Sequence, residues 1–239
     1  MKTVAIIQAR MGSTRLPGKV LLDLAGEPML ARVVARVRRA RRVDEVLVAT
    51  TTETPDDALA TLCAARGWLC FRGSETDVLD RYYRAASGRG AEVIVRITSD
   101  CPLIDPAVID AAIEGRELQQ ADYCANVVRR TYPRGLDVEV FTFAALETAW
   151  REDDKPEWRE HVTQFILHHP ERFGLTNMSH DEDHSDLRWT VDTPEDFELM
   201  GKIYGHFGHD EFSWQEVLAL LAQHPQWNEI NRHIEQKKV

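Results

Sequence analysis

Residues 4–19 read VAIIQARMGSTRLPGK, an apolar run followed directly by a loop rich in glycine, hydroxyl and basic residues. The run over 4–7 is typical of a buried strand, and ligands of open parallel sheets bind beyond the carboxyl ends of the strands. Gly12 and Gly18 allow backbone N–H groups to approach a phosphate closely. Arg10, Arg15 and Lys19 can neutralise its charge. This stretch therefore predicts a strand that opens into a polyanion-binding loop.

Strands and helices are expected to alternate from this loop to the middle of the chain. Apolar runs predict further strands over 46–49, 68–71 and 93–97, and helical spacing predicts helices over 28–40, 55–66, 76–87 and 106–114. Such alternation is typical of a doubly wound, mostly parallel sheet with helices on both faces. We therefore expect an α/β fold. The basic run from Arg36 to Arg42 is interpreted as a solvated helix face.

The second half of the chain has a less regular pattern. Alternation over 137–143 predicts a half-buried strand, and a short strand is expected over 187–191. Helices are expected over 157–168, 194–204 and 214–221. No linker or repeat divides the sequence, so we expect one domain over 1–239 with an insertion around 121–180.

Composition narrows the class of protein. The 239 residues carry a formal charge of -10 with a pI near 5.4, which disfavours nucleic acid as a partner and requires a local basic pocket for any nucleotide. No apolar run is long enough to span a membrane. Cys63, Cys70, Cys101 and Cys124 contain no Cys-x-x-Cys pair, so we interpret them as buried free thiols of a cytoplasmic protein.

Two familiar phosphate motifs do not fit residues 8–19. A P-loop has four residues between its glycines and a Ser or Thr after its Lys, whereas five residues separate Gly12 from Gly18 and Val20 follows Lys19. The Gly-x-Gly-x-x-Gly pattern of dinucleotide-binding domains is absent as well.

The loop instead resembles the nucleotide-binding signature of the CMP-sugar synthetases, which include the octulosonate and acylneuraminate cytidylyltransferases. The whole chain most resembles their relatives in spore coat polysaccharide biosynthesis, on the segments 96–103, 160–163 and 188–196. The resemblance implies a nucleotidyltransferase-type sheet and transfer of CMP from CTP to a sugar or sugar acid, with release of pyrophosphate, for surface polysaccharide synthesis. It also implies Mg²⁺ and a homodimer. Ala9-Arg10, where hexose-phosphate nucleotidyltransferases usually have Gly-Gly, favours cytidine.

The resemblance also suggests roles for particular residues. Asp100 and Asp192 are expected to hold Mg²⁺, although Asp100 also suits a turn and either Asp192 or Thr193 also suits a helix cap. Lys19 and Arg15 are expected to offset charge on the β- and γ-phosphates, and Arg10 to lie nearer the α-phosphate or the base. The remaining candidates for nucleotide binding are Ala9, Gly12, Ser13, Arg72, Ser74 and Ser99.

The acceptor side is less well defined. Asp137 and Glu139 point to the same face of a strand and can bind sugar hydroxyls or metal, or form an acidic stripe in solvent. A sugar acid requires a cationic partner, for which Arg129, Arg130 and Arg134 are candidates. His161 is interpreted as structural first and as a substrate contact second. The polar stretch 180–184 fits an exposed loop better than a metal cluster.

Two other functions remain open at the level of sequence. A glycosyltransferase has a similar nucleotide-binding half, but it binds a finished nucleotide sugar and releases no pyrophosphate. A noncatalytic nucleotide-binding relative binds CTP without turnover.

Overall fold

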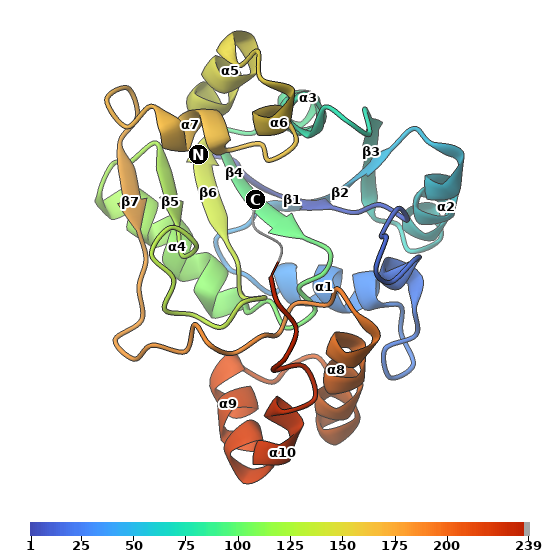
Figure 1. Ribbon diagram of the computed structural model, residues 1–239. Coiled ribbons are helices and arrows are strands. Elements are labelled where there is room, and N and C mark those ends of the chain that lie inside the picture. The colour runs from blue at the N-terminus through green and yellow to red at the C-terminus, as the bar shows by residue number, and fades with distance from the viewer. Residues whose placement is uncertain (237–239) are drawn as a thin grey trace.

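The computed structural model describes residues 1–236, which fold around one seven-stranded sheet (Figure 1). The strands are β1 Thr3–Gln8, β2 Glu45–Thr51, β3 Leu69–Gly73, β4 Val93–Thr98, β5 Tyr123–Ala125, β6 Glu139–Thr142 and β7 Leu175–Asn177. Their order across the sheet is β3-β2-β1-β4-β6-β5-β7. The first four strands pair in parallel, β6 runs antiparallel to both β4 and β5, and β5 pairs in parallel with β7. The expected α/β fold with a mostly parallel sheet is confirmed.

Helices cover both faces of the sheet. They are α1 Met29–Val37, α2 Asp57–Ala65, α3 Val78–Arg89, α4 Pro106–Leu118, α5 Phe143–Glu152, α6 Pro156–Arg159, α7 Gln164–His168, α8 Pro194–Phe207, α9 Trp214–Gln223 and α10 Pro225–Asn228, with single 3₁₀ turns at Lys19–Leu21 and Thr54–Asp56. No helix within residues 1–236 is both long and apolar enough to cross a bilayer.

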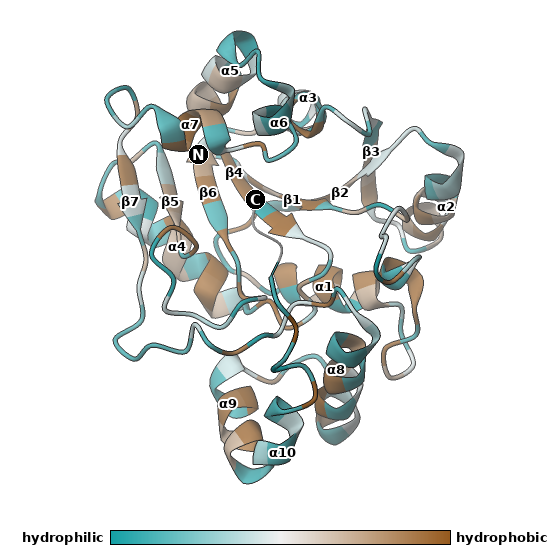
Figure 2. Cartoon of the chain, viewed as in Figure 1, coloured by the Kyte–Doolittle hydropathy of each residue, from teal (hydrophilic) through white to brown (hydrophobic). Residues whose placement is uncertain are grey.

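The alternation of side chains along β1 divides the core into two layers. Ala5 and Ile7 pack with α1, α2, α4, α8 and α9, whereas Val4 and Ile6 pack with α3, α5 and α7 on the opposite face. Figure 2 shows apolar colour on the central strands and on parts of the helices that surround them. Both faces of the parallel strands are therefore buried, as a doubly wound sheet requires.

Residues 121–180 add three strands to the common sheet, of which β5 and β7 were not predicted. The strand expected over 137–143 is present as β6, but the expectation of a half-buried strand is wrong because Glu139, Val140 and Phe141 are all buried. The physical reason is that β6 lies inside the sheet, between β4 and β5. Short strands such as β5 and β7 carry too few residues to display a period.

The expectation of a single helix over 157–168 is also wrong. The chain forms α6 and α7 instead, separated at Val162, whose φ of 62° belongs to the left-handed region. A β-branched residue is rare there, and a helix cannot continue through it. Thr163 hydrogen-bonds to Glu139 at 2.6 Å and so helps to hold this turn.

The strand expected over 187–191 is reduced to one bridge, between Arg134 and Arg188. Gly135, with a φ of 110°, turns the partner segment away after a single residue. A Cβ atom at position 135 would lie 2.5 Å from the carbonyl carbon of Trp189, so only glycine permits this close approach.

The exposure of Arg36 and of Cys70 differs from what the sequence led us to expect. Arg36 is fully buried rather than part of a solvated face, because its guanidinium donates to the carbonyls of Ile104, Asp210 and Phe212. All four cysteines are free thiols, but Cys70 is exposed, since it lies on the edge strand β3.

Candidate active site

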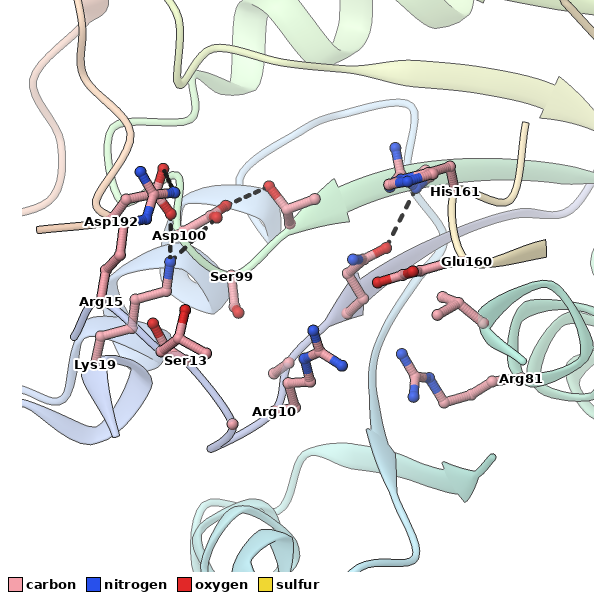
Figure 3. A pocket seen from close by; sticks show the side chains of 17 residues that line it. Arg10, Ser13, Arg15, Lys19, Arg81, Ser99, Asp100, Glu160, His161 and Asp192 are labelled. Atoms are coloured by element: carbon pink, nitrogen blue, oxygen red, sulfur yellow. Dashed lines mark hydrogen bonds and ion pairs between the residues drawn. The ribbon is translucent and has the colours of Figure 1, made fainter. Parts of the chain in front are cut away.

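A cavity of about 360 Å³ opens at the carboxyl ends of β1 and β4, a volume in the range of small-molecule sites (Figure 3). It lies where the rule for open α/β sheets places a ligand. Of the residues that the sequence analysis assigned to nucleotide or metal, those that line it are Ala9, Arg10, Gly12, Ser13, Arg15, Lys19, Ser99, Asp100 and Asp192.

Hydrogen bonds to Met11 hold the loop after β1 in place, and several backbone amides of the loop remain without a partner. The amide of Met11 donates to Asp56 at 2.7 Å, and the carbonyl of Met11 accepts from Ser13 and Gly18. The amides of Gly12, Thr14 and Arg15 donate no hydrogen bond within residues 1–236. Free amides beside cationic side chains form an anion-binding loop. Asp56 was missed by sequence reasoning, because its role depends on the packing of β2 beside β1.

Three oxygen atoms converge on the ammonium group of Lys19 at one end of the cavity. Its Nζ lies 2.6 Å from the carbonyl oxygen of Val191, 3.0 Å from Asp192 Oδ1 and 3.3 Å from Asp100 Oδ2. Burial acts to lower the pKa of Lys19, but Asp100 and Asp192 outweigh it and raise this pKa above its ordinary value. Lys19 is therefore fully charged at neutral pH.

Asp192 is shared among cations. Its Oδ2 lies 2.9 Å from Arg15 and 2.9 Å from Arg188, in addition to the contact with Lys19. Burial acts to raise the pKa of Asp192, but Lys19, Arg15 and Arg188 hold it below the ordinary value for an aspartate. The cap of α8 is Thr193, which forms a capping box with Asp196, so Asp192 is left to face the cavity.

Asp100 follows β4 at its carboxyl end. Its Oδ1 accepts from the Thr98 hydroxyl at 2.5 Å, and its Oδ2 faces Lys19. Val191 donates its amide to the Asp100 backbone carbonyl at 2.8 Å, which joins the two segments that carry Asp100 and Asp192.

The far side of the cavity contains residues that sequence reasoning did not assign to ligand binding. These are Gln8, Arg81, Arg96 and Glu160. His161, for which a substrate contact was the second interpretation, lines the cavity as well. Arg96 pairs with the buried Glu139, whose other oxygen accepts from Tyr123 at 2.8 Å and from Thr163 at 2.6 Å. The cavity wall thus has five cationic and three acidic side chains, a local basic site on an acidic protein.

Several predicted site residues lie elsewhere. Arg72 and Ser74 line a separate hollow beside α3, and Arg72 is paired with Asp57 at 2.7 Å. Asp137 forms a two-point ion pair with Arg130, and Arg134 lines a second cavity near the C-terminal segment. Glu139 reaches the first cavity only through Arg96. Within residues 1–236, no group of three or more His, Cys, Asp or Glu side chains is placed to hold a metal ion.

A family model, related sequences and a solved structure all point to the same protein family. The family model described as cytidylyltransferase matches residues 4–227. Protein MJ1063 of Methanocaldococcus jannaschii is 38% identical, over 99% of this chain and 97% of its own length. The spore coat polysaccharide biosynthesis protein SpsF of Bacillus subtilis is 34% identical, over 92% of this chain and 94% of its own length. A cytidylyltransferase structure from Leptospira borgpetersenii superposes with a TM-score of 0.91 at 33% identity, covering both chains completely.

Proposed function

The chain belongs to the cytidylyltransferase family, and on that premise we propose that it transfers CMP from CTP to a hydroxyl group of a sugar or sugar acid. The product is a CMP-sugar for surface polysaccharide synthesis, and pyrophosphate is released. The observation that carries the proposal is the meeting of the phosphate loop with two carboxylates, where Lys19 contacts both Asp100 and Asp192. We further propose a cytoplasmic setting and a homodimer.

The donor set at Lys19 fits a divalent metal ion. Asp100, Asp192 and the Val191 carbonyl present hard oxygen ligands around one cationic centre. Mg²⁺ commonly takes one or two carboxylates and completes its shell with phosphate oxygens and water, so the lack of a third acidic ligand suits it. Asp100 and Asp192 would hold the ion, which supplies charge neutralisation at the phosphates when bound.

The residues of the loop account for the remaining chemistry. The oxygen of the acceptor hydroxyl forms a bond to the α-phosphorus of CTP and gives up its proton to water, while the bond from that phosphorus to the bridging oxygen breaks and pyrophosphate leaves with the electron pair. Lys19 and Arg15 offset the charge that develops on the leaving group. The free amides of Gly12 and Thr14 orient the phosphate chain. Because the negative charge of the reaction lies on the phosphates of the substrate, the protein contributes by positioning the reactants and by stabilising that charge.

The acceptor is proposed to enter beside Glu160, His161 and Arg96. These side chains line the same cavity as the phosphate loop, and Arg96 is held by Glu139. Asp137 and Arg134 remain candidates for a more distant contact with the acceptor.

Release of pyrophosphate tests the proposal. Each of the four nucleoside triphosphates is incubated with Mg²⁺ and a panel of free sugars, sugar acids and sugar phosphates. We expect release with CTP and one acceptor class. If CTP binds but no acceptor gives pyrophosphate, the proposal is wrong and a noncatalytic nucleotide-binding protein is supported. Transfer from a finished nucleotide sugar without pyrophosphate would support a glycosyltransferase.

A further inference from the structure

The chain after α10 runs back toward the sheet and passes the start of α8 (Figure 1). It lies beyond residues 4–227, the part of the chain that the family model matches. Asn231 of this segment is 3% exposed, and its side-chain amide donates to the Arg188 carbonyl and to Asp196 Oδ1, each at 2.9 Å. Both partners are acceptors, so the amide nitrogen must face them and both of its hydrogens are used. Asn231 therefore links the C-terminal segment to the beginning of α8.

Asp196 is fully buried and accepts hydrogen bonds from five donors. Its Oδ1 accepts from Asn231 and from Arg188 Nε, both at 2.9 Å. Its Oδ2 accepts from Arg188 Nη2 at 2.9 Å and from the backbone amides of Asp192 and Thr193. A carboxylate that is bonded from so many sides has one orientation, and the guanidinium of Arg188 forms a two-point pair with it. The position of Arg188 is thus set by Asp196 together with Asn231.

Arg188 connects this buried group to the first cavity. Its Nη2 also donates to Asp192 Oδ2 at 2.9 Å, which leaves Asp192 Oδ1 to face Lys19 at 3.0 Å. Gln236, from the same C-terminal segment, accepts from Arg188 Nη1 at 2.6 Å, so all three nitrogens of the guanidinium are bonded. Arg15 lies 2.9 Å from the same Asp192 Oδ2 and competes for it. A displaced Arg188 would therefore leave Asp192 to its other cations and change the direction of its carboxylate.

We propose that Asn231 is a positioning residue for Asp192, the proposed metal ligand, an inference that rests on the proposed function. Asn231 acts through Asp196 and Arg188, and it keeps the guanidinium where it holds one oxygen of Asp192 and leaves the other to the cavity. Residues that orient a metal ligand commonly change metal affinity by about tenfold to a hundredfold when they are replaced. Residues 229–236 line the first cavity at no point, yet through Arg188 they help to set its affinity for Mg²⁺.

The experiment titrates Mn²⁺, the probe for the Mg²⁺ site, into protein saturated with CTP, without any acceptor. The electron paramagnetic resonance signal of free Mn²⁺ reports binding, CTP without protein is the blank, and Asp192→Asn gives the effect of losing the ligand itself. We expect Asn231→Ala to weaken Mn²⁺ by about tenfold, and excess Mg²⁺ to restore its rate of pyrophosphate release. Gln236→Ala should weaken Mn²⁺ by less, since Gln236 bonds to one nitrogen of Arg188. Gln236 is exposed, so this variant tests the inference even if Asn231→Ala does not fold.

Asn228→Ala is the matched control and should bind Mn²⁺ as the wild type does. Asn228 lies in α10, and within residues 1–236 its side chain hydrogen-bonds to neither Arg188 nor Asp196. Unchanged Mn²⁺ affinity in the folded Asn231→Ala and Gln236→Ala proteins overturns the inference, even where urea unfolding shows lower stability, because the segment is then merely structural. It is also overturned if Asn228→Ala weakens Mn²⁺ equally, or if Asp192→Asn leaves Mn²⁺ affinity unchanged. Failure of the proposed function is distinguishable, since the wild type would then release no pyrophosphate with any acceptor while the Mn²⁺ affinities of the variants would still differ.

Discussion

At the scale of single residues, Lys19 has the most unusual surroundings in the site. Its ammonium group is almost buried and contacts two carboxylates and one carbonyl oxygen. These contacts keep the cation at the end of the phosphate loop, and a charge positioned there stabilises the negative charge that develops on the leaving group.

Lys19→Met should lower kcat by about a hundredfold to a thousandfold, the usual effect of removing one preorganised charge-stabilising group. The measurement is pyrophosphate release at saturating CTP and acceptor. Lys202→Met is the control, since Lys202 is exposed on α8, far from the cavity lining, and its ammonium group pairs with Glu198 and lies over the Trp227 ring. Full activity of the Lys19 variant would show that the phosphates are neutralised elsewhere.

The sequence identified one side of the cavity better than the other. Lys19, Arg15 and Gly12 lie in one continuous stretch, so composition alone marks them as an anion-binding loop. Arg81 and Arg96 lie on separate elements that packing brings together, and each resembles an ordinary surface arginine in the sequence. A long-range contact of this kind leaves no local signal.

At the scale of elements, the beginning of α8 decides where Asp192 points. The Thr193 hydroxyl accepts from the Asp196 amide, and the Asp196 carboxylate accepts from the Thr193 amide, so this capping box lies directly beside the functional side chain of Asp192. Asp196 also accepts from Arg188 and from the Asp192 amide.

Thr193→Ala should lower the free energy of unfolding by about 1 kcal/mol, the typical value of an N-cap. Urea unfolding followed by circular dichroism measures this change. Thr148→Ala is the control, because the Thr148 hydroxyl bonds only to its own helix, at the exposed surface. Equal stabilities for the two variants would mean that Asp196 alone maintains the cap.

Most of the helices and the parallel strands were predictable because their apolar periods run over many residues. The failures at 157–168 and 187–191 have a common cause. In each case one residue with positive φ ends the regular structure: Val162 lies within the predicted helix, and Gly135 lies in the segment that would have paired with the predicted strand. Such angles are set by the tertiary contacts of the turn, which neighbouring residues in the sequence do not specify.

At the scale of the whole molecule, Glu139 joins β4, β5, β6 and the start of α7. It is buried and bonds to Arg96, Tyr123 and Thr163, one from each neighbouring segment. Burial acts to raise the pKa of Glu139, but Arg96 and the two hydroxyl groups outweigh it and leave this pKa below the ordinary value of 4.5.

A depressed carboxylate pKa stabilises the folded state above the unfolded pKa, and this stabilisation is lost as the pH falls through the folded value. Glu139→Gln should therefore cost about 3 kcal/mol at pH 7, as breaking a buried ion pair does. The free energy of unfolding of this variant should also fall less steeply than that of the wild type as the pH drops below 4.5. Urea unfolding from pH 7 to pH 3.5 measures both effects, with the exposed Glu198→Gln as control. Parallel pH curves for Glu139→Gln and the wild type would contradict this assignment.

The close approach of Gly135 to the Trp189 backbone has a consequence for how this protein can change. A Cβ atom at position 135 would collide with backbone atoms of Trp189 and Thr190, and no change of a neighbouring side chain can remove a clash with backbone. In a saturation library selected for folded protein, we expect position 135 to return glycine alone. Gly88, in α3 with open space around it, should accept most residues and gain stability with alanine, by up to about 1 kcal/mol. Two glycines in one chain would thus show opposite mutational tolerance.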